Sequence, residues 1–259
     1  MKPVTEKEYK IILAQEYEDV PIKQNSVKYM SIDIGITNAL TCYDYKGNSH
    51  IISGRQWLSM ERYFHKKIAH FQAISDAQQV AKGVKYPKKS KRVLQLYRKR
   101  KAQTFHLLHC MTKKAIDLAV RQGVETIVIG DITGIRKNVQ LGKKTNQKFH
   151  QLPFKKIIQM LTYKAEEQGI SVARMSEEYT SQTCSMCKPY PSKKFTKKSN
   201  RKHRGLYVCD DCQHVINADV NGAMNIGKKY LKEIGSLSQS VVVLDTPTVY
   251  TFNRQQFVA

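Results

Sequence analysis

The feature that most constrains this chain is a set of four cysteines in its C-terminal half. They form two Cys-x-x-Cys pairs separated by residues 188–208, and they are Cys184, Cys187, Cys209 and Cys212. Zn²⁺ prefers four soft ligands at the corners of a tetrahedron, and each Cys-x-x-Cys turn supplies two thiolates. We therefore predict a structural zinc site that stabilises the fold, since four protein ligands leave no open position for chemistry.

Two disulfides, or a redox pair, are the alternative interpretation of these cysteines. Disulfides persist in oxidising compartments, whereas the N-terminus MKPVTEKEYK lacks the apolar segment of a secretory signal. No run in the sequence approaches the ~18–20 apolar residues that are needed to cross a bilayer. We expect a soluble intracellular protein whose four cysteines bind metal, with no membrane partner.

The charge of the chain points to a polyanionic partner. Lys and Arg number 44 against 21 Asp and Glu, which gives a formal net charge of +23. A field of this sign attracts nucleic acid, the commonest polyanion that a soluble intracellular protein meets. Much of the charge lies in residues 85–101 and in residues 188–205, and the second range has eight Lys or Arg and no acid. We expect both ranges to follow a phosphate backbone.

Hydrophobic periodicity predicts an α/β domain with helices packed on a mixed sheet. The expected order is a strand pair with a turn at YKGN, two helices, a strand, a helix, a strand, the cysteine region and a last helix. Their ranges are 27–54, 57–80, 91–122, 124–135, 149–169, 170–181 and 217–235. The second helix is expected to bury a stripe made of Leu94, Phe105, Leu108, Met111, Ala115, Leu118 and Ala119.

Several carboxylates lie where strands or helices are expected to begin or end. Asp33 stands between two isoleucines in an apolar strand. Burying a carboxylate there destabilises the fold by several kcal/mol unless the carboxylate is paired or binds metal. Asp131 ends a second strand, Glu177 and Glu178 end a third, and Asp219 begins the last helix, where it can also serve as a cap. Such ends can gather carboxylates around two divalent cations, a site that hydrolyses phosphodiesters.

Three segments in this order, SIDIGITN, IVIGDITGIR and EEYTSQTCSMC…YVCDDC…ADVNGAMNI, resemble the RuvC-like nuclease core of the TnpB family. These transposon-encoded proteins are related to the type V CRISPR effectors, and the resemblance covers roughly residues 28–232. It implies an RNase H-like (RuvC-like) mixed sheet flanked by helices, with a zinc ribbon inserted between the second and third catalytic segments. It also implies RNA-guided cleavage of DNA with Mg²⁺.

The resemblance assigns Asp33 to the first catalytic aspartate and Asp219 to the last. The family pattern usually ends its second strand with Glu-Asp-Leu, whereas this chain has Gly130 in place of the glutamate. Some relatives carry a glutamate just before Tyr-Thr-Ser instead, and Glu177 fits that position best. Glu178 and Asp131 are the alternatives.

Two further departures from the family concern the ends of the resemblance. The last motif usually reads Arg-Asp-x-Asn, and Ala218 stands here in place of the arginine. The family also carries a sizeable N-terminal region for guide and target binding, which the 27 residues before the resemblance do not match. We expect a fragment, a decayed copy, or a minimal form that works with a separate N-terminal or transposase partner.

The resulting division of the chain has four parts: a short N-terminal remnant (1–27), a nuclease core (28–179 and 213–235), an inserted zinc ribbon (180–212) and a C-terminal tail (236–259). The first predicted function is a transposon-associated, RNA-guided DNA endonuclease with two Mg²⁺ ions, acting on DNA with a guide RNA in a prokaryotic cytoplasm, at the nucleoid. The alternative is a nuclease-inactive or truncated nucleic-acid-binding protein that acts as a repressor or transposition accessory.

Neutralising the Lys and Arg of residues 188–205 is expected to flatten the salt dependence of nucleic-acid binding. Each phosphate contact contributes about −0.9 to the slope of log K against log[salt] on B-DNA, and about −0.7 on single strands. Titration of labelled DNA at several salt concentrations measures this slope. An unchanged slope would remove these residues from the nucleic-acid interface.

Overall fold

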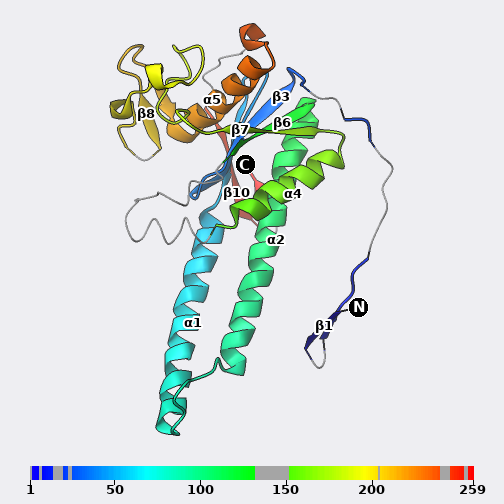
Figure 1. The fold of residues 1–259 in the computed structure, drawn as a ribbon, viewed down its shortest axis with the longest axis vertical. Helices are drawn as coiled ribbons and strands as arrows, with labels where there is room; N and C mark the ends of the chain where they lie inside the picture. The colour runs from blue at the N-terminus through cyan, green and yellow to red at the C-terminus, as the bar shows by residue number, and fades with distance from the viewer. Residues whose placement is uncertain are drawn as a thin grey trace.

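The computed structural model describes residues 2–5, 8–13, 20–22, 25–131, 152–203, 205–239, 246–253 and 256–259. Its centre is a mixed sheet with the strand order β11-β10-β5-β4-β3-β6-β7 (Figure 1). The strands are β3 (Tyr29–Asp33), β4 (Asn38–Asp44), β5 (Ser49–Ser53), β6 (Thr126–Asp131), β7 (Ser171–Ser176), β10 (Thr248–Asn253) and β11 (Gln256–Val258).

The register of the sheet brings three strand ends to one edge. Strands β3, β6 and β7 run parallel, with Ile32 opposite Ile129 and Gly130 opposite Met175. Strand β4 is antiparallel to β3 and to β5, and β10 extends the sheet by pairing in parallel with β5. The C-terminal ends of β3, β6 and β7 therefore lie side by side.

Helices cover both faces of the sheet, as the sequence predicted (Figure 1). Helices α1 (Arg55–Ala81) and α2 (Lys91–Gln122) form a long hairpin that projects beyond the sheet. Helix α4 (Phe154–Glu166) packs on α2, and all three share one apolar core with the sheet. Helix α5 (Ala218–Glu233) covers the opposite face.

Successive side chains along each strand point to opposite faces of the sheet, and this alternation decides which helices a residue packs against. Met30, Ile32, Ile127 and Ile129 pack into the core under α1, α2 and α4. Tyr29 and Val128 pack against Ile226, Tyr230 and Leu231 of α5. By the same alternation, the ends of β3 and β6 direct Asp33 and Gly130 toward the α5 face.

Helix α5 packs directly on β3, and a glycine stands at the contact. The Ser31 hydroxyl donates to the carbonyl of Ala223 at 2.7 Å. A Cβ atom on Gly227 would lie 2.5 Å from Cε2 of the Tyr29 ring, which is only 1% exposed. The absence of a side chain at residue 227 thus sets the distance between helix and strand.

Two sequence predictions about this core need correction. Residues 27–54 hold three strands, not two, and the turn at Tyr45–Asn48 joins β4 to β5. On α2, Leu94 and Phe105 are 42% and 45% exposed, although the other predicted stripe residues are buried. Most of the residues before Phe105 lie in the projecting hairpin, where α1 is the main packing surface.

Smaller elements lie around the main sheet. Strands β1 (Lys2–Thr5) and β2 (Glu8–Lys10) pair with each other, and the cysteine region forms a hairpin of β8 (Leu206–Val208) and β9 (Val215–Asn217). Short 3₁₀ helices are η2 (Lys193–Phe195), η3 (Lys198–Asn200) and η4 (Leu237–Gln239).

Some predicted ranges extend past the described residues. The end of the predicted strand 124–135 and the start of the predicted helix 149–169 lie outside them. None of the helices in the described part of the chain combines the length and apolarity that crossing a bilayer needs.

Replacing Gly227 by alanine is expected to destabilise the protein by about 1–3 kcal/mol, because the added methyl group overpacks the contact with Tyr29. Elsewhere in a helix the same change stabilises by roughly 0.5–1 kcal/mol, so the sign of the effect is diagnostic. Urea unfolding measures it, with Glu233→Ala at an exposed position of α5 as the control. A more stable Gly227→Ala protein would contradict the close packing of α5 on β3.

Candidate active site

The structure places the three predicted catalytic carboxylates around the aligned strand ends. Asp33 is the last residue of β3, Glu177 directly follows β7, and Asp219 lies in the first turn of α5. Strand β6 separates β3 from β7, and its Gly130 lies between them in the register. The Glu177 side chain therefore has to cross β6 to approach Asp33.

Gly130 provides the space for this crossing. A Cβ atom on Gly130 would lie 2.8 Å from Cγ of Glu177 and 2.9 Å from its Cδ, and closer still to Oε1. Real Cβ contacts essentially never fall below about 3 Å. The Glu177 carboxyl group thus occupies the volume that a side chain at residue 130 would need, so the glycine and the glutamate are complementary.

The other two candidates for the second carboxylate lie differently. Asp131 continues the series of Ile127 and Ile129, which faces α2 and α4, away from α5. Glu178 is exposed to solvent. The geometry thus brings Glu177 to the face that carries Asp33, and Asp131 lies close enough to Glu177 for its charge to raise the pKa of Glu177.

The carboxylates interact electrostatically. Burial holds the pKa of Asp33 well above its usual value, and the charges of Glu177 and Asp219 raise it further, with Arg201 opposing them. Burial and the charge of Asp131 raise the pKa of Glu177 to about 7, against the effect of Lys229. Carboxylates that disfavour one another's ionisation in this way are common at sites that bind cations or protons.

Asp219 is oriented by neighbours that the sequence did not single out. The Asn38 amide donates to Oδ2 of Asp219 at 2.7 Å, and Nη2 of Arg201 lies 3.9 Å from Oδ1. The helix cap comes from Asn217, whose side chain accepts from the backbone N–H groups of Asp219 and Val220. The capping alternative for Asp219 is therefore wrong. Asn38 is the last residue of the SIDIGITN motif, so the motif could have identified Asn38 as a site residue.

A second glycine makes room for Asp33. A Cβ atom on Gly222 of α5 would lie 2.6 Å from Oδ2 of Asp33. The carboxylate of Asp33 thus sits between β3 and the first turns of α5, near Asp219. Glycines on two elements, Gly130 and Gly222, shape the same cluster.

The donor set of this cluster fits a hard divalent cation. Mg²⁺ prefers carboxylate oxygens, and Oε1 of Glu177 is buried without a hydrogen-bond partner among the described residues. The carboxylate oxygens of Asp33, Glu177 and Asp219 do not all lie within 4.8 Å of one another, whereas the four cysteine sulfurs do. A site for two cations about 3.5–4 Å apart spreads its ligands over a wider region.

The four cysteines form the tighter cluster. Cys184 and Cys212 have sulfurs 3.7 Å apart, Cys187 and Cys209 also 3.7 Å, and all four lie within 4.8 Å of one another. A tetrahedron with metal–sulfur bonds of about 2.3 Å requires sulfurs about 3.8 Å apart. The cysteines are free thiols in the structure, so the disulfide alternative is wrong and the cluster fits a tetrahedral metal ion.

Part of the basic charge near this cluster is already paired. Lys188 lies 2.8 Å from Asp211, Lys197 also contacts Asp211, and Lys202 lies 3.0 Å from Asp210. Both aspartates lie between the last two cysteines. The sequence predicts that residues 188–205 follow a phosphate backbone as a whole, but three of the lysines bind carboxylates inside the ribbon.

The other basic range has a similar exception. Arg100 donates to the buried Glu61 of α1, with Nη2 2.6 Å and Nε 2.9 Å from Oε2. This pair ties α2 to α1, so Arg100 is structural. The remaining basic side chains of residues 85–101 are exposed, and they are Lys85, Lys88, Lys89, Lys91, Arg92, Arg98, Lys99 and Lys101.

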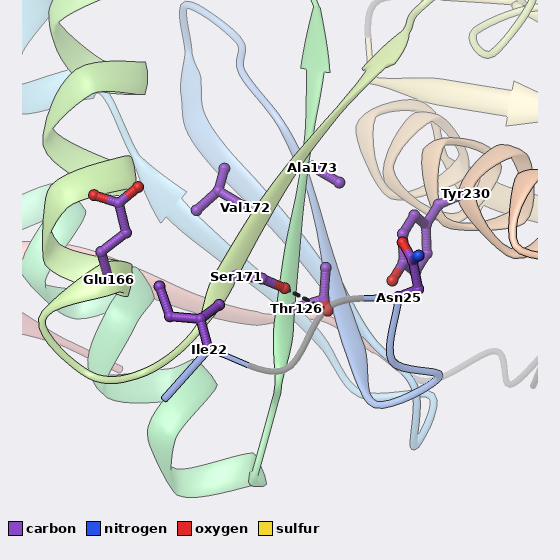
Figure 2. Close-up of a pocket in the computed structure, with 8 residues that line it drawn as sticks. All are labelled: Ile22, Asn25, Thr126, Glu166, Ser171, Val172, Ala173 and Tyr230. Carbon is purple, nitrogen blue, oxygen red and sulfur yellow. Dashed lines mark hydrogen bonds between the residues drawn. The ribbon is translucent and has the colours of Figure 1, made fainter. Parts of the chain in front are cut away.

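A cavity of about 300 Å³ lies at the opposite end of the strands (Figure 2). Its lining includes Thr126 and Ser171, which begin β6 and β7 and share a hydrogen bond of 2.8 Å. None of the three carboxylates lines this cavity. It is therefore separate from the candidate active site.

Comparison with known families gives two matches along the chain. Residues 12–136 match the model described as "Probable transposase" (OrfB_IS605), and residues 154–226 match "Cas12f1-like, TNB domain". The two matches together span more than half of the chain. The second includes Glu177, Asp219 and all four cysteines.

Curated relatives agree with these matches. The chain is 27% identical over 227 residues to the TnpB-like protein ORF457 of Acidianus two-tailed virus, covering 87% of this chain and 47% of the relative. It is 34% identical over 118 residues to the CRISPR-associated endodeoxyribonuclease Cas12f1 of Sulfoacidibacillus thermotolerans, and this match covers 46% of this chain and 25% of the relative. The matches thus span about half or less of the length of these relatives.

Solved structures share the fold. A CRISPR-Cas12f ternary complex matches with a TM-score of 0.57 and 18% identity, covering 83% of this chain and 40% of the other. A Cas12f1–sgRNA–target DNA complex matches with a TM-score of 0.56 and 19% identity, covering 76% and 49%.

The raised pKa of Glu177 predicts a specific dependence of stability on pH. A carboxyl whose pKa rises from 4.5 to about 7 on folding binds its proton more tightly in the folded state. The free energy of unfolding therefore falls as pH rises from about 4.5 to about 7. We expect Glu177→Gln to remove ~1–3 kcal/mol of this fall, since one pKa unit corresponds to about 1.4 kcal/mol.

Urea unfolding of both proteins at pH 5 and pH 8, with Mg²⁺ left out, measures this difference. Added Mg²⁺ should stabilise the wild type most at pH 8, where the carboxylates are ionised. Parallel pH profiles for wild type and Glu177→Gln would contradict the buried position of Glu177.

Proposed function

Because the chain belongs to the TnpB family, we propose that it acts in transposon-associated, RNA-guided cleavage of DNA. Its chemistry is the hydrolysis of phosphodiesters at a RuvC-like site that uses two Mg²⁺ ions. The observation that carries this proposal is the position of the Glu177 carboxyl group beside Gly130. A glutamate side chain thereby occupies the place where the family pattern usually has one.

The fold supports the same proposal. Strands β5, β4, β3, β6 and β7 follow one another in the sheet, and only β4 is antiparallel to the others. This is the arrangement expected of an RNase H-like core. Several curated relatives are named endodeoxyribonucleases, and one matched structure is a complex of Cas12f1 with sgRNA and target DNA, which favours DNA and RNA as partners.

The residues of the site have distinct roles in this mechanism. Asp33, Glu177 and Asp219 would hold the cations, and the chemistry that the cations would supply is activation of the attacking water and stabilisation of the leaving oxygen. Asn38 fixes the orientation of Asp219 through its hydrogen bond. The guanidinium of Arg201 brings positive charge to the same place and is suited to bind the scissile phosphate.

The remaining features bind nucleic acid or stabilise the fold. Exposed Lys and Arg side chains of residues 85–101 bind the phosphate backbone, together with Lys193, Lys194 and Lys198, for which the described residues supply no ion pair. The four cysteines hold a structural Zn²⁺, in the tetrahedral geometry that their sulfurs suit. The division into core, ribbon (180–212) and tail, with β10 and β11 of the tail adding two strands to the core sheet, and a location at the prokaryotic nucleoid, belong to this proposal.

The alternative, a nuclease-inactive nucleic-acid-binding protein, is suggested mainly by the missing glutamate at residue 130. The position of the Glu177 side chain weakens this argument. We therefore favour the endonuclease.

Cleavage of single-stranded DNA with and without Mg²⁺ tests the proposal. Loss of a residue that supports a metal ligand costs about 10–100-fold, so Asp33→Asn and Glu177→Gln, which remove proposed ligands, should cost at least about 100-fold. Glu233→Gln, on the exposed side of α5, should leave the rate unchanged.

Exchanging the glycine and the glutamate tests whether residues 130 and 177 supply the same carboxylate. Gly130→Glu alone should slow cleavage, because the new side chain competes with Glu177 for the same space. The double variant Gly130→Glu/Glu177→Ala should cleave faster than either single variant. Full activity of Glu177→Gln, or a wild type that binds DNA without cleaving it, would refute the proposed function.

A further inference from the structure

Helix α5 carries a stripe of buried polar side chains that no part of the mechanism above uses. Asn221, Asn225 and Lys228 follow one another at intervals of four and three residues, so they lie on one face of the helix. Asn221 and Asn225 are fully buried, and Lys228 is 5% exposed. Their partners are main-chain groups between Thr180 and Lys188, in the segment that links Glu177 to the first cysteine pair.

The two asparagines hold the turn that carries Glu177. The Asn225 amide donates to the carbonyls of Thr180 and Thr183 at 2.8 and 2.7 Å, and the Asn221 amide reaches the same two at 3.4 and 2.9 Å. Thr180 in turn donates to the Glu177 carbonyl through its hydroxyl at 2.7 Å and its N–H at 3.2 Å. The backbone of Glu177 is thus fixed to the helix that also carries Asp219.

The same stripe holds the first cysteine pair. The Asn221 carbonyl oxygen accepts from the N–H of Ser185 at 2.9 Å. The Lys228 ammonium donates to the carbonyls of Ser185 and Lys188 at 2.6 and 2.7 Å. Ser185 lies between Cys184 and Cys187, and Lys188 directly follows them. One face of α5 therefore holds the Glu177 turn and a metal-binding turn together.

Charge gives Lys228 a second link to the cysteines. Burial lowers the pKa of Lys228, whereas negative charge on Cys184 and Cys187 raises it. Four thiolates around a dication leave a net negative charge, which a buried ammonium beside them offsets. A buried donor that loses its partner destabilises the folded state, so these hydrogen bonds favour forming together.

We infer that Asn221, Asn225 and Lys228 form a main-chain clamp that couples metal binding by the four cysteines to the position of Glu177. When the cysteines bind metal, the turn at 184–188 is fixed, the clamp closes on it, and the Glu177 turn is held beside Asp33. Without that metal the segment 177–188 loosens as a unit. The three residues are positioning residues. The coupling itself does not require cleavage, but its effect on activity rests on the proposed function.

Hydrogen exchange and metal release test the coupling without any activity. The full chain is loaded with Zn²⁺, and its release to a chromogenic chelator is timed for wild type, Asn225→Leu and Lys228→Met, with Glu233→Gln as the control. We expect both clamp variants to release Zn²⁺ at least about tenfold faster. Amides of residues 177–183 should also exchange about tenfold faster after Zn²⁺ is removed from the wild type. Unchanged exchange there on removal of Zn²⁺, or unchanged release from both variants, would overturn the inference.

A second experiment shows whether the clamp acts through Glu177. A glutamate at residue 130 is carried by β6, so the Gly130→Glu/Glu177→Ala protein should not need the clamp. Asn225→Leu should therefore slow cleavage about tenfold or more in the wild-type background and much less in the exchanged background. Equal losses in both would show that Asn225 acts by another route and would overturn this part of the inference.

The two experiments also separate the clamp from the proposed function. If neither background cleaves DNA, the nuclease proposal fails, and metal release and hydrogen exchange still decide whether the clamp couples the two turns.

Discussion

The contact between the Glu177 side chain and the bare backbone at Gly130 underlies the rest of the site. It exists because β3, β6 and β7 run parallel in one register and end together, so a side chain that follows β7 can cross β6 toward Asp33. A methyl group at residue 130 would close that path. A carboxylate in this position is buried and close to other carboxylates, which explains its raised pKa and its suitability for a cation.

Helix α5 completes the arrangement because it takes part in three contacts at once. It approaches β3 through Gly222 and Gly227, it presents Asp219 at its first turn, and its buried polar stripe holds the backbone that follows Glu177. The cysteine region is therefore connected to the carboxylate cluster through the helix as well as through the chain. In the proposed mechanism, a metal ion held by the cysteines would thus affect the carboxylates without taking part in the chemistry.

The sequence predicted the parts whose signals are local. The spacing of the cysteines, the helical periods of α1 and α2, and the apolar surroundings of Asp33 all depend on neighbours in the chain. The contact of Glu177 with Gly130 depends on the register of two strands joined by a long connection, which no local pattern contains. Arg201 lay within a range predicted to bind phosphate, and only the folded ribbon brings it to Asp219. Leu94 and Phe105 matched a helical stripe, but in the folded chain both side chains are largely exposed.

The proposed mechanism requires that Glu177, and not Asp131, completes the cation site with Asp33 and Asp219. Anomalous diffraction from crystals of this chain soaked in Mn²⁺, which also prefers oxygen ligands, would locate the cations and identify their ligands. We predict anomalous peaks in direct contact with the carboxylates of Asp33 and Glu177, with Asp219 as a further ligand. Peaks that contact Asp131, with the Glu177 side chain turned away from Gly130, would contradict this assignment.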